Sequence, residues 1–210
     1  SDVLFRLEQP LLRNFGTDVF YRQTVLVTPT DAHFPGRADS VDAMARLVFE
    51  QVQRHAALSH WPTRLVPPEH SDPTARPRLA RTGPIRGASA PAPEPVDEAH
   101  VLTFTYAPNM VGNPEALIAS FAHNLAHFMA SLAQEVPPGG RDNWPQLTEV
   151  LAVFMGFGLM IVNTAYQSPK VGCGSCHVPG AERSGALSQF DLTYALALFS
   201  TLKGTPNAEV

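Results

Sequence analysis

The sequence predicts a mainly α-helical α+β fold with a small sheet and a long proline-rich excursion, in a single domain over residues 1–210. Several segments combine an N-capping residue with apolar side chains at helical spacing. Two short β-branched runs indicate the sheet. The chain has 20 prolines, and nine of them lie in residues 61–97. A chain of 210 residues is long enough to bury one substantial core.

The first part of the chain alternates helical and strand patterns. We expect a short helix over residues 2–15, ended by Gly16, and then a buried strand within 19–28 around the run Val-Leu-Val. Ser40 is a good N-cap for a helix that reaches about Leu58. The apolar stripe of this helix is predicted to consist of Val41, Met44, Leu47, Val48 and Val52.

Residues 61–97 cannot form a long helix, because proline recurs throughout and removes backbone donors. Arg76, Arg78, Arg81 and Arg86 make the segment locally basic. A long excursion of this kind is either a surface segment, with room for one edge strand, or a binding loop. We favour the surface excursion. A strand is expected next at 101–105.

Three helices are predicted in the second half. The first runs from Asn113, a good N-cap followed by Pro114, to about Glu135. The second covers 146–167 and is apolar all round over 150–162, which is typical of a central core helix and too short to span a bilayer. The third begins at the N-cap Ser188 and ends at Gly204, with buried side chains that include Tyr194.

Composition limits the classes of partner. The net charge of −4 favours neither nucleic acid nor an anionic membrane as a partner. The chain has only two cysteines, so no disulfide framework holds the fold. The start of the chain lacks a basic segment followed by an apolar run, so we expect a cytoplasmic protein.

Two histidines of the helix that begins at Asn113 form the first candidate site. His123 and His127 are four residues apart and therefore lie on one side of the helix, as two zinc ligands must. Glu149, early in the next helix, is the candidate third ligand if the two helices pack antiparallel. The alternative is that the histidines are simply a half-buried pair at the surface.

Four segments carry a family resemblance: Val-Leu-Val-Thr-Pro-Thr at 25–30 with His-Phe-Pro after it, His-x-Leu-Ala-His at 123–127, Leu-Thr-Glu-Val-Leu-Ala-Val-Phe-Met-Gly-Phe-Gly at 147–158, and Leu-Ser-Gln with Tyr-Ala-Leu-Ala-Leu-Phe within 187–199. In these segments the chain resembles a little-characterised group of bacterial zincin-like metalloproteins that carry His-Glu-Leu-Ala-His. The resemblance implies a zincin-like helical core, with His123 and His127 at the zinc-ligand positions and Glu149 at an acidic position.

Asn124 departs from this family pattern, in which a glutamate follows the first histidine and acts as general base. An amide has no titratable oxygen that could take a proton from zinc-bound water. The metal ligands are retained without the catalytic base. We therefore predict a metal-binding pseudo-peptidase without peptidase activity, acting as an accessory or scaffold subunit beside other proteins.

A competing motif is Cys173-Gly-Ser-Cys176-His177, the attachment sequence for c-type haem. In that interpretation the two cysteines hold the haem, His177 ligates its iron, and the protein is a periplasmic electron carrier. The cysteines could instead be a redox pair, part of a second metal site, or inert, and His177 or a thiolate could join His123 and His127 at one metal. A third hypothesis is an interaction protein that uses neither site.

Overall fold

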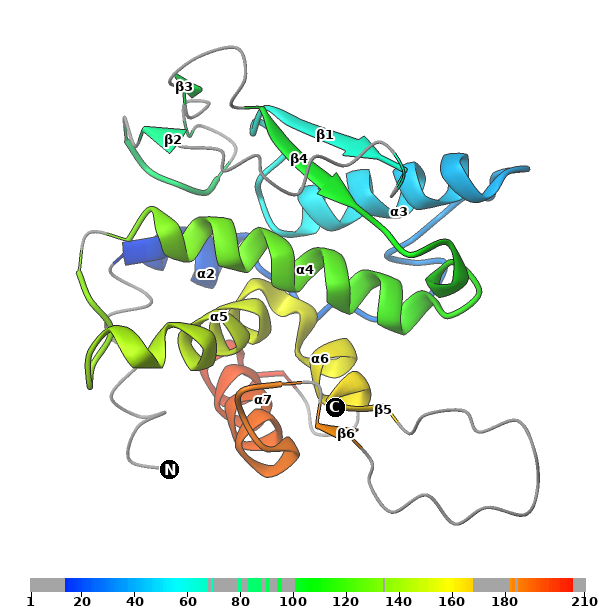
Figure 1. The fold of residues 1–210 in the computed structure, drawn as a ribbon. Helices are drawn as coiled ribbons and strands as arrows, with labels where there is room; N and C mark the ends of the chain where they lie inside the picture. The colour runs from blue at the N-terminus through cyan, green and yellow to red at the C-terminus, as the bar shows by residue number, and fades with distance from the viewer. Residues whose placement is uncertain are drawn as a thin grey trace, which may run out of the picture.

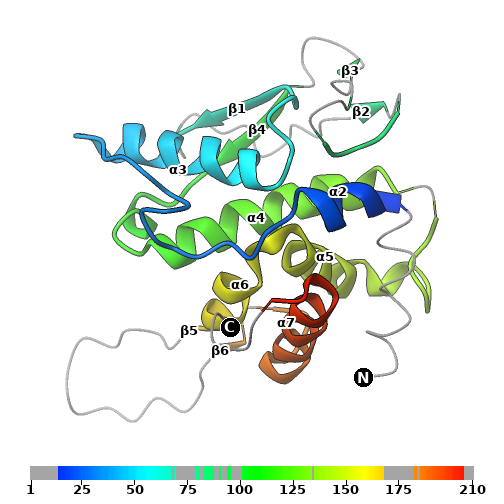
Figure 2. The ribbon, with the colours of Figure 1, turned by 180° about the vertical axis from the view of Figure 1, so that it is seen from behind.

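The computed structural model describes residues 14–67, 69, 79–80, 83–87, 90, 94–95, 101–133, 135–167, 182–183 and 185–205. The fold is mainly α-helical with small two-stranded sheets, as predicted. Helix α4 (Pro114–Ser131) runs through the middle. Figures 1 and 2 show helix α3 and the strands β1 and β4 on one side of α4, and α5, α6 and α7 on the other. The side chains of α4 are therefore the ones best placed to line a site.

The segment before α3 differs from the prediction. Most of the helix expected at 2–15 lies outside the described residues. Helix α2 covers Thr17–Arg22, where the beginning of a strand region was expected. The run at 25–27 is extended but joins no strand among the described residues. Val27, fully buried, instead donates its backbone N–H to the carbonyl oxygen of Gly156 at 2.9 Å. Val25 is 49% exposed, so Val27 is the residue of this run that packs against the helix break, and the β-branched pattern does not reflect sheet pairing among the described residues.

Helix α3 spans Val41–His55, and Ser40 caps it as predicted, since its Oγ accepts from the N–H of Ala43 at 3.1 Å. The helix ends three residues before Leu58. Val41 is not part of the buried stripe, because its side chain in the first turn is 46% exposed. The buried apolar residues of the helix are Ala45, Val48, Phe49 and Val52.

The main sheet has two parallel strands, β1 (Thr63–Val66) and β4 (Leu102–Thr105), in the register that places Thr63 beside Leu102. Strand β4 was predicted, and β1 is the strand for which the proline-rich excursion had room. Strands β2 (Leu79–Ala80) and β3 (Glu94–Pro95) form a second, antiparallel pair. A short 3₁₀ helix, η3 (Pro108–Met110), then leads from β4 towards α4.

Part of the excursion at 61–97 reaches the core. Trp61, Leu65, Ile85 and Arg86 are all at most 5% exposed. The Arg86 guanidinium donates from Nε to the carbonyl oxygen of Ala56 at 2.9 Å and from Nη2 to Oγ1 of Thr24 at 3.1 Å. Burial lowers the pKa of Arg86 to about 10. The described residues near Arg86 therefore anchor the excursion to the main body.

The predicted central helix is interrupted. A 3₁₀ turn, η4 (Arg141–Asn143), leads into α5 (Trp144–Ala152), which is followed by a π-helical segment, η5 (Val153–Phe157), and by α6 (Gly158–Thr164). The break lies at Gly156, whose φ is 102°. The stretch Arg141–Thr164 is long and apolar enough to cross a membrane, but 78% of its apolar window is buried inside the fold, as in a core helix.

Helix α7 (Gln189–Lys203) matches the prediction at both ends. Ser188 and Asp191 form a capping box, and Gly204 ends the helix in the left-handed conformation with a φ of 64°. Phe199 is fully buried, whereas Tyr194, expected to be buried, is 43% exposed. Before α7, strands β5 (Tyr166–Gln167) and β6 (Glu182–Arg183) pair antiparallel.

Candidate functional site

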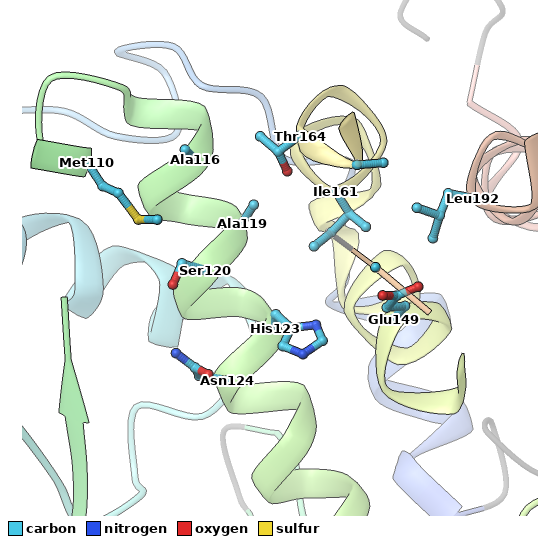
Figure 3. Close-up of a pocket in the computed structure, with 12 residues that line it drawn as sticks. Met110, Ala116, Ala119, Ser120, His123, Asn124, Glu149, Ile161, Thr164 and Leu192 are labelled. Atoms are coloured by element: carbon cyan, nitrogen blue, oxygen red, sulfur yellow. The ribbon is translucent and has the colours of Figure 1, made fainter. Parts of the chain in front are cut away.

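A pocket of about 230 Å³ lies between α4, α5 and α6, with α7 at its edge. Figure 3 shows α4 on one side and α5 and α6 on the other, with side chains from both sides directed into the space between them. Much of the wall consists of small and aliphatic side chains, among them Ala116, Ala119 and Ile161. Polar atoms come from the side chains of Ser120, His123, Asn124, Glu149 and Thr164.

His123 is half-buried on α4 and points towards Glu149 (Figure 3). Burial lowers the pKa of His123, an effect that the negative charge of Glu149 opposes and the nearby His127 reinforces. A histidine with a lowered pKa is neutral at pH 7. Neutral imidazole is the form that ligates a metal ion, so the environment of His123 favours a ligand role.

Glu149 is the second polar group of the pocket, on the second turn of α5. It is 5% exposed, so its carboxylate is removed from solvent. Oε1 accepts from the backbone N–H of Ala186 at 2.6 Å, and Oε2 accepts from that of Leu187 at 2.7 Å. These bonds compensate for the burial of the charge. A carboxylate has about four acceptor positions, so both oxygens keep a lone pair with which to bind a cation.

His127, the third predicted ligand, lies outside the pocket wall. Its side chain is exposed, and its ring meets that of Phe128 edge-on at 5.9 Å. Within the described parts of the chain, no three His, Cys, Asp or Glu side chains converge closely enough to hold a metal ion. The structure thus brings His123 and Glu149 together and leaves His127 one turn further along the same helix.

Asn124 also lines the pocket. In Figure 3 its amide points to the other side of α4 from His123. Its neighbour Ser120, one turn earlier, lies on the same side. Both side chains are neutral, so neither supplies a group that titrates near pH 7.

The cysteines and the histidine of the haem motif, Cys173, Cys176 and His177, lie outside the described residues. The haem interpretation therefore stays a prediction from the sequence.

Sequence reasoning missed the two backbone amides that hold Glu149. Backbone donors carry no residue-type signal, so no motif could identify Ala186 and Leu187. The one usable signal is Gly185: a Cβ added there would lie 2.6 Å from Oε1 of Glu149. Gly185 lies three residues before the N-cap Ser188, and the absence of a side chain there permits this close approach of the carboxylate.

No protein-family model matches the chain, and neither the curated proteins nor the solved structures include a match to it.

Proposed function

We propose that this chain is a zinc-binding, zincin-like protein whose ligands are His123, His127 and Glu149. The observation that carries the proposal is the placement of His123 and Glu149 on neighbouring helices at one pocket. Figure 1 shows α5 returning alongside α4, which is the antiparallel arrangement that lets the two side chains meet.

The chemistry of these donors suits zinc. Imidazole nitrogen and carboxylate oxygen are both common zinc ligands, and three protein ligands leave a fourth position for water or a partner group. His127 is exposed, and exposed side chains change rotamer within nanoseconds, so it is available to complete the set. Metal-bound carboxylates are themselves usually hydrogen-bonded, and Glu149 already accepts from Ala186 and Leu187.

The proposed role is non-catalytic. Zinc, when bound, can polarise a carbonyl group and acidify water, but peptide hydrolysis also needs a positioned base. In the sequence, Asn124 takes the place of the glutamate that serves as this base in the His-Glu-x-x-His motif, and an amide cannot accept a proton. In the structure its amide points to the other side of α4 from His123. General-base catalysis typically contributes roughly 10²–10⁴-fold to the rate. The protein then acts as a pseudo-peptidase that binds or scaffolds.

Helix α7 offers a surface for the protein partners that this role requires. Phe190 is 89% exposed and Tyr194, one turn later, is 43% exposed. Aromatic side chains are enriched at protein–protein interfaces. We propose that an accessory function operates through this surface, with other protein subunits as partners.

Zinc titration against a chromophoric chelator tests the proposal. The wild-type chain is expected to take up one zinc ion, in keeping with a single three-ligand site. His123→Ala and Glu149→Ala should each weaken binding strongly, and His127→Ala should do so as well. His60→Ala is the matched control, because His60 does not line the pocket. Equal binding by all the variants would refute the assignment. Iron with a haem spectrum in place of zinc would favour the motif at 173–177 instead.

A further inference from the structure

The segment just before α7 is attached to the proposed site through Glu149. The N–H groups of Ala186 and Leu187 point at the two oxygens of one buried carboxylate, at 2.6 and 2.7 Å. Ser188 follows at once and caps α7, where its Oγ accepts from the N–H of Asp191 at 3.1 Å. Leu192, in the first turns of α7, lines the pocket. One carboxylate therefore links the pocket to the start of the next helix.

The fit between this segment and the carboxylate is close. A Cβ added at Gly185 would lie 2.6 Å from Oε1 and 3.2 Å from Cδ of Glu149, and its φ is outside the left-handed region. Alanine at this position is therefore compatible with the backbone, and its methyl group meets the carboxylate. The least costly response is a movement of the Glu149 side chain, which would lengthen the bonds to Ala186 and Leu187.

We infer that residues 185–187 position Glu149 for the metal, and that zinc binding and attachment of this segment to Glu149 strengthen each other. The inference rests on the proposed zinc site. Each amide uses one acceptor position of one oxygen and leaves another for the ion. The amides hold the carboxylate in one orientation before metal binds, which is how outer hydrogen bonds raise metal affinity. By thermodynamic reciprocity, bound zinc then stabilises the attached segment by the same factor.

Through this coupling, zinc binding can affect the start of α7. Phe190 lies in the first turn of the helix whose start the amides hold in place. Zinc occupancy is then expected to stabilise the first turn of α7, where Phe190 lies.

Hydrogen exchange of single amides, measured by NMR on the wild-type chain, tests the effect of zinc on the segment. Zinc should slow exchange at Ala186 and Leu187 by about tenfold, the low end of typical outer-shell effects. The amide of Ala43 is the internal control: Ser40 holds it at 3.1 Å at the start of α3, and neither residue lines the pocket. Unchanged or faster exchange at Ala186 and Leu187 in zinc-bound protein would overturn the inference.

Zinc affinity of Gly185→Ala tests the reciprocal effect. The variant should bind zinc roughly 10–100-fold more weakly, as variants of outer hydrogen-bond partners typically do. Gly112→Ala is the matched control, because a Cβ there meets nothing within 4 Å. If the wild type binds zinc through His123 and Gly185→Ala binds it equally well, this inference fails and the zinc site stands. If the wild type binds no zinc, both fail.

Discussion

The contact between Gly156 and the segment at 25–27 gives the sharpest stability prediction. Gly156 has a φ of 102°, and a Cβ added there would lie 2.2 Å from the backbone oxygen of Val25. Its own carbonyl accepts from the N–H of Val27 at 2.9 Å. Gly156→Ala therefore strains the backbone and collides with a backbone atom that cannot rotate away.

The expected loss of unfolding free energy follows from these contributions. A non-glycine residue in such a conformation costs about 1–3 kcal/mol. Forcing the two segments apart by about 1 Å adds roughly 1–3 kcal/mol of overpacking, and the weakened hydrogen bond of Val27 adds about 1 kcal/mol. We expect a total of about 5 kcal/mol. For a chain of this size that corresponds to a fall in Tm of roughly 15 °C.

Thermal unfolding followed by circular dichroism measures the effect, and Gly140→Ala supplies the control. Gly140 has a φ of 100°, but a Cβ there meets nothing within 4 Å. Gly140→Ala therefore reports backbone strain without the collision and should lower Tm by roughly half as much or less. If Gly156→Ala lowers Tm no further than Gly140→Ala does, the account of how the helix break docks on residues 25–27 is refuted.

Three further predictions concern the core, pH and catalysis. Phe199→Ala should lower the free energy of unfolding by about 3–5 kcal/mol, because Phe199 is fully buried. Phe190→Ala, at an exposed position on the same helix, should change it by less than about 0.5 kcal/mol. Urea unfolding of both variants measures the difference. The pKa values of His33, His60 and His123 are lowered in the folded protein, so below pH 6.5, the ordinary pKa of histidine, the unfolded chain binds more protons than the folded one. The free energy of unfolding should therefore fall as the pH drops below 6.5. Denaturation midpoints measured from pH 5 to 8 would contradict this if they stayed level or rose on acidification. Asn124→Glu should leave zinc binding intact and add slow hydrolysis of an unstructured peptide; no hydrolysis by the zinc-loaded variant would argue against a peptidase ancestry.

Local signals in the sequence predicted most of the helices. Ser40, Asn113 and Ser188 each cap the helix that was expected to follow, because capping depends on atoms within a few residues. The predicted strand at 25–27 was wrong because its partner is a distant helix break at Gly156. That break was itself not predicted, because a continuous helix and an interrupted helix can have the same apolar sequence pattern.

The candidate site was partly predictable. Helical spacing and a short connection were enough to place His123 and Glu149 together. His127, one turn further along α4, is exposed and does not line the pocket, and helical spacing alone does not determine how deeply each turn of a helix is buried. The amides of Ala186 and Leu187 were beyond prediction, because their direction depends on how the chain approaches α7.

The metal content of protein purified without added metal from its native organism is the most direct measure of the central claim. We predict about one zinc ion per chain and no iron, with zinc lost from His123→Ala and retained in His60→Ala. About one iron per chain with a haem spectrum and no zinc would contradict the claim. Protein that holds neither metal, and takes up no zinc when it is offered, would contradict it as well.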